Sequence, residues 1–81
     1  MRKKDELSKA HTCMQTAHPE EMVFVLLGRD VAAPEAIRAW VAERVRLGKN
    51  ASGDPQITEA LECAATMERE GRLWVGKERE P

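Results

Sequence analysis

The hydrophobic pattern of this chain is concentrated between Met22 and Leu47, where a continuous apolar run is followed by an amphipathic one. Six apolar residues in succession occupy positions 22–27, bounded by two glutamates on one side and by Gly28 on the other. β-branched and aromatic side chains fit a pleated surface. The run therefore predicts a strand at 22–27 that is buried on both faces.

A helix is predicted directly after this run, at 33–47. Pro34 suits a first helical turn, and Glu35 complements the positive end of the helix dipole. Apolar residues then recur at steps of three and four and form one stripe. The members of the stripe are Ile37, Trp40, Val41 and Val45. Gly48 is expected to end this helix.

A second helix is predicted from Pro55 to about Gly71, with Asp54 as its N-cap. Its apolar stripe consists of Ile57, Ala60, Leu61, Ala64 and Met67. The connection at 48–53 is short and polar, so the two helices are expected to form an antiparallel hairpin. The alanines at 60, 64 and 65 permit another helix to approach closely.

Two shorter elements complete the prediction. A short helix is expected over 5–16, ended by Pro19, and a short C-terminal strand over 73–75 that pairs with the strand at 22–27. The predicted fold class is thus α+β and mostly helical. The chain is expected to divide into an N-terminal helix (1–18), a core of strand plus helical hairpin (19–76) and a disordered charged tail (77–81).

Composition limits the classes of function. The chain has 81 residues, of which 33% are charged, and a net charge of −1, which gives no general attraction to nucleic acid or anionic lipid. The longest apolar run is too short to cross a bilayer. No apolar segment typical of a secretory signal follows the basic first residues, and the only cysteines are Cys13 and Cys63. We therefore expect a cytoplasmic protein with reduced thiols.

The residue types that bind metals are present, but their spacing is unfavourable. His11, Cys13, His18 and Cys63 form no C-x-x-C or H-x-x-x-H pair. The sequence also lacks the nucleophile-elbow, phosphate-loop and dinucleotide motifs. We expect no metal, no cofactor and no catalytic residue, with the cysteines as small buried thiols.

Two sets of side chains are candidates for binding. Arg29, Arg38 and Lys49 belong to a run of basic residues in the sequence, and Arg29 lies just ahead of a helix N-terminus. The three would hold an anion if they converge. The alternative is that these arginines pair with nearby glutamates. The apolar candidates for partner binding are Phe24, Leu26, Trp40 and Trp74. Trp40 is expected in the core, and the alternative is that it is an exposed binding anchor.

The predicted strand at 22–27 has at most a three-residue partner in its own chain, which leaves an open edge. Such edges pair across a twofold axis or are covered by a partner, so a homo-oligomer is expected. The order of elements also matches a winged-helix domain with 55–71 as its recognition helix. That helix carries a single arginine, Arg69, among five acidic residues at positions 54 to 70, so binding of nucleic acid is not expected.

The motif FVLLGRDVAAPEAIRAW at 24–40 resembles a recurring pattern in small phage- and prophage-encoded proteins. The residues at 48–50, 57–60 and 67–68 look similar to the same group, so that the resemblance spans about 50 residues. It implies an accessory protein of a mobile element, acting in the host-cell cytoplasm, and it carries over no site residue.

The function expected from these observations is protein–protein binding without catalysis, as an adaptor or an inhibitor of a host factor. One alternative is an oligomeric sponge that sequesters an anionic nucleotide through Arg29, Arg38 and Lys49. A second alternative is a DNA-binding regulator of the winged-helix kind.

Overall fold

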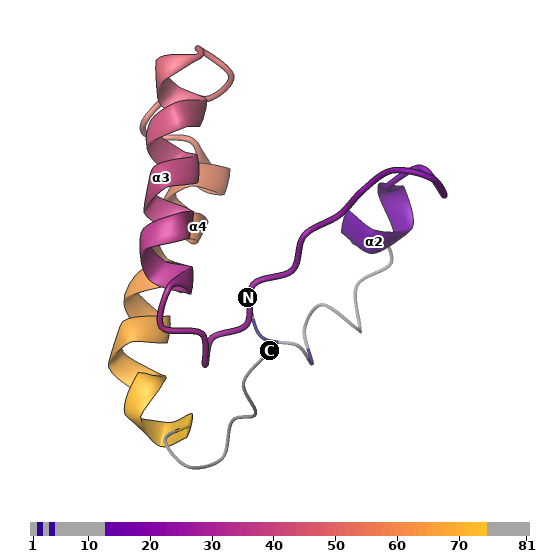
Figure 1. Cartoon of the computed structure of the whole chain (residues 1–81). Coiled ribbons are helices and arrows are strands. Elements are labelled where there is room, and N and C mark those ends of the chain that lie inside the picture. Colours follow the sequence, from indigo (N-terminus) through magenta and orange to yellow (C-terminus); the bar gives the residue numbers. More distant parts are fainter. Residues whose placement is uncertain (1, 3, 5–12, 75–81) are drawn as a thin grey trace.

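The computed structural model describes residues 2, 4 and 13–74 (Figure 1). Its elements are α2 (Cys13–Thr16), α3 (Ala33–Arg46), α4 (Pro55–Glu70) and the 3₁₀ helix η1 (Gly71–Trp74). Figure 1 shows α3 and α4 side by side as a hairpin, with α2 at a distance from them. Within the described part of the chain, the protein is a small helical hairpin and contains no strand.

Local sequence accounts for the start of α3. The Asp30 carboxylate accepts a hydrogen bond from the Ala32 backbone N–H at 2.9 Å, and its carbonyl accepts one from the Ala33 N–H at 3.0 Å. Pro34 follows in the first turn. Asp30 thus caps the turn that leads into the helix, because it satisfies backbone donors that have no partner inside the helix.

The connection between the two helices is held by a half-buried asparagine. The Asn50 side chain accepts a hydrogen bond from Arg44 Nε at 2.6 Å and donates to both Asp54 and Gln56 at 3.1 Å. Gly48 has a φ of 73°, the left-handed conformation that glycine adopts at the end of a helix. The predicted helix end at Gly48 and the predicted start at Pro55 are both confirmed.

The hydrophobic core lies between α3 and α4 and is small. Among the described residues, the buried hydrophobic side chains are Ala33, Val41, Ile57 and Ala64. Val41 and Pro34, which is also buried, lie seven residues apart on α3, and Ile57 and Ala64 lie seven apart on α4, which places each pair on one face. The close approach predicted for the alanine-rich face of the second helix is confirmed at Ala64.

The predicted strand at 22–27 is wrong. This segment is extended, but it pairs with no other segment of the described chain, and Met22, Phe24 and Val25 are 93%, 86% and 65% exposed. Its expected partner is absent because Leu73 and Trp74 continue the path of α4 as the 3₁₀ helix η1. A strand requires a neighbour for its backbone hydrogen bonds. The α+β fold class is therefore corrected to a helical hairpin.

The expectation that Trp40 belongs to the core is also wrong, because this side chain is 41% exposed. The contact between α3 and α4 runs along smaller residues, and large members of both stripes remain at its edge. Val45 is 38% exposed and Leu61 is 42% exposed. The stripes were identified correctly, but only part of each stripe faces the other helix.

The remaining predictions of domain organisation are covered only in part. Of the helix expected at 5–16, the structure describes the last turn as α2, Cys13–Thr16, and residues 5–12 lie outside the described part. Residue 75 and the tail at 77–81 lie outside it as well. In the part that is described, no helix is both long enough and apolar enough to cross a membrane.

Candidate binding groove

An open groove of about 570 Å³ runs along one side of the hairpin. It is lined by three segments of the chain, the extended residues before α3 and one face of each long helix. The lining residues are Phe24, Leu26, Ala36, Ile37, Trp40, Gln56, Glu59, Ala60 and Cys63. We refer to this surface as the groove.

Helical periodicity explains why these residues share one face. Ile37 and Trp40 lie three residues apart on α3, and Ala60 and Cys63 lie three apart on α4, so each pair projects on the same side of its helix. Ala36 and Ala60 are too small to fill the space between the helices. The result is a hollow, mostly apolar surface beside the core.

Trp40 is the largest of the side chains that line the groove. The Arg44 guanidinium lies over its ring, 5.6 Å from the ring centroid, in a cation–π contact. Because Arg44 Nε also donates to Asn50, the guanidinium is fixed between the indole and the interhelical connection. Glu59 of α4 is the one charged side chain that lines the groove, and Arg44 lies next to the groove, over Trp40.

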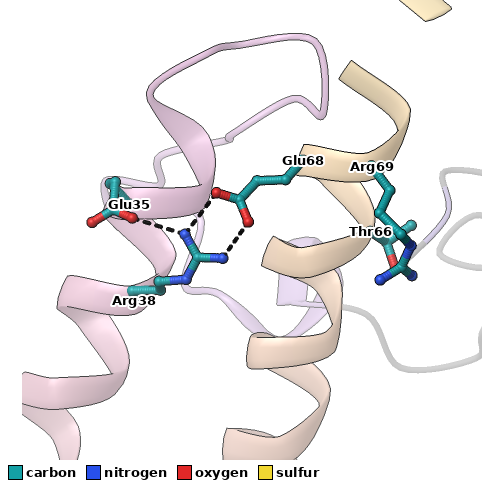
Figure 2. Close-up of polar contacts among 5 residues, drawn as sticks. All are labelled: Glu35, Arg38, Thr66, Glu68 and Arg69. Atoms are coloured by element: carbon teal, nitrogen blue, oxygen red, sulfur yellow. Dashed lines mark hydrogen bonds and ion pairs between the residues drawn. The ribbon is translucent and has the colours of Figure 1, made fainter. Parts of the chain in front are cut away.

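At the other end of the hairpin, Arg38 joins the two helices (Figure 2). Its Nη1 donates to Glu35 at 2.8 Å and to Glu68 at 3.0 Å, and its Nη2 donates to Glu68 at 2.5 Å. These hydrogen bonds lower the pKa of the Glu68 carboxyl from its usual value, and they raise the pKa of Arg38. Figure 2 also shows Arg69 next to Thr66, to whose hydroxyl it donates at 3.0 Å.

The structure does not gather the predicted anion-binding residues at one place. Arg38 faces two carboxylates near the start of α3, whereas Lys49 lies in the connection at the opposite end of the hairpin. Arg29 is exposed in the turn before α3. Arg38 instead pairs with Glu35 and Glu68, as the alternative prediction for these arginines states.

Three of the four predicted apolar residues do come together. Phe24, Leu26 and Trp40 all line the groove. Trp74 is 40% exposed in η1 and does not line it. The sequence interpretation did not assign a site role to the other six lining residues, although Ile37 and Ala60 belong to the recognised stripes. The helical spacing of these residues, together with the small size of Ala36 and Ala60, was the feature of the sequence that indicates a hollow surface.

The polar groups of the groove are few. Its lining contains one carboxylate, one side-chain amide and the half-buried thiol of Cys63. In residues 2, 4 and 13–74, no cluster of three or more His, Cys, Asp or Glu side chains is placed to hold a metal ion. An apolar hollow with a few polar groups at its edges favours contact with another apolar surface.

No protein-family model matches this chain, and no curated protein or solved structure matches it significantly. The resemblance of residues 24–40 to small phage- and prophage-encoded proteins therefore stays a prediction.

Proposed function

We propose that this chain is a non-catalytic protein-binding module and that the groove is its binding surface. The observation that supports this proposal is the exposure of two large aromatic side chains at one apolar hollow. Trp40 is 41% exposed and Phe24 is 86% exposed, and both line the groove. Exposed aromatic residues beside a hollow are typical of the residues that dominate binding energy at protein interfaces.

In the phage or prophage context suggested by residues 24–40, such a module acts as an adaptor or as an inhibitor of a host factor in the cytoplasm. The alternative of a nucleotide sponge requires convergent cations, and the Arg38 guanidinium is already bonded to Glu35 and Glu68. The winged-helix alternative requires a basic recognition helix, whereas α4 has only Arg69 in its last turn. Protein binding is the function that the groove favours.

A photo-crosslinking experiment tests this proposal. Benzoylphenylalanine is introduced at Phe24, on the groove, and separately at Ala42 as a matched control. Ala42 is exposed, and it lies two residues from Trp40 on α3, which is roughly 200° around the helix. Irradiation of the cells that produce the protein is expected to yield covalent protein adducts from position 24 and not from position 42.

The captured protein is then purified, and its affinity is measured by calorimetry with the unsubstituted chain and with Trp40→Ala. An interface anchor contributes about 2 kcal/mol or more, so the dissociation constant should rise roughly thirtyfold. Circular dichroism of the variant checks that the hairpin remains helical. Equal adduct formation at the two positions, or an unchanged affinity of a folded Trp40→Ala variant, would contradict the proposal.

A further inference from the structure

The segment at 22–27 differs from the helices in the state of its backbone. Within the described part of the chain, no backbone N–H or C=O of residues 22–26 forms a hydrogen bond with another residue. The segment lies between two backbone turns, one closed by the N–H of Glu21 and the other by the N–H of Asp30. In Figure 1 it is the extended trace that leads from α2 towards α3. Its main chain is therefore open to a second molecule.

An endopeptidase binds its substrate as an extended strand. Main-chain hydrogen bonds hold a peptide bound in this way, and pockets for alternate side chains select its sequence. Residues 22–26 already have the conformation and the open backbone groups that such a cleft requires. A helix has neither, because its N–H groups are bonded to carbonyls of the same helix. Cleavage inside a helix therefore requires local unfolding first.

The side chains of the segment single out one peptide bond. Phe24 is the one phenylalanine of the chain, and both it and Val25 are exposed. Successive side chains of an extended chain point to opposite sides. Phe24 and Leu26 accordingly line the groove, and Val25 does not. The half-buried Leu26 holds the segment on the hairpin, while the bond between Phe24 and Val25 joins two exposed residues.

The helices contain comparable side chains on a bonded backbone. Trp40 and Leu61 are large, apolar and exposed, but they lie inside α3 and α4. An endopeptidase with an apolar pocket would accept either side chain if the backbone around it were extended. The segment thus combines an exposed aromatic side chain with an open main chain, and the interiors of the two long helices do not.

We infer that the segment is a site of limited proteolysis, at which endopeptidases that accept a large apolar side chain hydrolyse the Phe24–Val25 bond. Water is the co-reactant: its oxygen joins the carbonyl carbon of Phe24, the C–N bond breaks, and the nitrogen of Val25 leaves as an amine that takes up the protons. The products are the chains 1–24 and 25–81. This inference goes beyond the proposed function, because it requires no partner at the groove.

Digestion of the full chain with chymotrypsin under native conditions tests the inference, with fragments identified by mass spectrometry over time. Cleavage after Phe24 is expected to be about a hundredfold or more faster than cleavage after Trp40 or Leu61, because helix positions are cut only in the small unfolded fraction. The chain 25–81 should accumulate, since it keeps both long helices. Cleavage inside α3 or α4 at a rate comparable to that after Phe24 would overturn the inference.

Val25→Pro removes the cleavable bond and leaves the hairpin unchanged. A proline nitrogen carries a ring in place of its hydrogen, and endopeptidases of this kind do not hydrolyse the bond before it. The residue before a proline prefers extended angles, which Phe24 already has. Cleavage after Phe24 should be lost, with the urea midpoint unchanged. Val23→Pro is the matched control, because it places the same residue in the segment and leaves the Phe24–Val25 bond cleavable.

Two further variants separate the backbone from the side chain. Phe24→Ala combined with Leu61→Phe moves the phenylalanine to an exposed position of α4 that does not line the groove. This double variant should lose the rapid cleavage without gaining one after position 61. Ile57→Ala, which destabilises the hairpin, should accelerate cleavage after Trp40 and leave the rate after Phe24 unchanged.

The opposite results have a definite meaning. Rapid cleavage after position 61 in the double variant, with its helix content intact by circular dichroism, would show that an exposed side chain is sufficient. A rate after Phe24 that rises in Ile57→Ala in parallel with the rate after Trp40 would show that general unfolding exposes the bond. Either result overturns the inference, and neither affects the test of partner binding at the groove.

Discussion

The α3–α4 hairpin and the segment Met22–Leu27 are both rich in apolar residues, yet they bury them to very different extents. Ile57 in the hairpin is 1% exposed, whereas Met22 in the segment is 93% exposed. The helices are amphipathic, so each presents an apolar face to the other and a polar face to water. The segment has no polar face, and no strand in the described part of the chain lies beside it. Burial therefore depends on a matching surface in the same chain rather than on hydrophobicity alone.

The largest effect is expected from truncation of the hairpin core. Ile57→Ala should lower the free energy of unfolding by about 2–5 kcal/mol, because it removes the largest fully buried side chain of the described residues and leaves a cavity. That loss approaches the total stability of a small domain. Urea denaturation followed by circular dichroism measures it.

Phe24→Ala is the matched change in the exposed segment. At 86% exposure, the phenylalanine ring has little burial to lose, so the free energy of unfolding at low protein concentration should change by less than about 0.5 kcal/mol. Equal losses of stability in Ile57→Ala and Phe24→Ala would remove the distinction between the two regions.

Trp40 lies where the two regions meet, since it shares the groove with Phe24 and Leu26. Complete burial of a tryptophan would make Trp40→Ala cost about 3–5 kcal/mol, but the 41% exposure reduces the expected cost to roughly 1–2 kcal/mol. The variant should remain helical and show a modest shift of its urea midpoint at low concentration. Complete unfolding of this variant would instead show that Trp40 is part of the hydrophobic core.

The smallest effect is expected on the stability of the hairpin at acidic pH. Hydrogen bonds from Arg38 lower the pKa of Glu68 from its usual value near 4.5. A carboxyl whose pKa is lowered in the folded state adds stability above its unfolded pKa, and this stability is lost as the pH falls through the folded value. The melting temperature of the unsubstituted chain should therefore fall more steeply than that of Arg38→Gln below pH about 4.5.

The two regions also differ in their response to acid. Positions 22–27 contain no titratable side chain, so the acid response reports on the hairpin and not on the segment. Glu43 and Glu70, whose pKa values are lowered by Arg46 and Arg2, keep part of the response in Arg38→Gln. Parallel melting curves for the two proteins down to pH about 3 would show that the Arg38 pair adds no stability.

The sequence was sufficient for the hairpin because the information that specifies it is local. Pro34, Gly48 and Pro55 mark where the helices start and stop, and the spacing of apolar residues indicates one face on each. The strand at 22–27 was predicted from β-branched and aromatic residues, a preference that depends strongly on surroundings. Leu73 and Trp74 could provide a partner strand or continue a helix. The path of α4 decides between the two, and local composition does not specify that path.

The groove was only partly predictable for a related reason. Phe24, Leu26 and Trp40 were identified as apolar candidates one at a time, but their convergence depends on how the turn at 27–30 directs the chain past α4. A contact at the end of that path is visible at Gly28, where an added Cβ would lie 3.5 Å from Met67 Cγ. Such a contact between residues far apart in sequence follows from the packing of the helices and has no local signature.

The connection at 47–54 has a consequence for the speed of folding. It joins Arg46 to Pro55 through eight residues, and the hydrogen bonds of Asn50 to Arg44, Asp54 and Gln56 are all formed within a few positions in the sequence. Proteins dominated by such local contacts fold in microseconds to milliseconds, because little chain entropy is lost before the contacts form. The hairpin should therefore assemble early, and the two helical walls of the groove assemble with it, within a single rapid event.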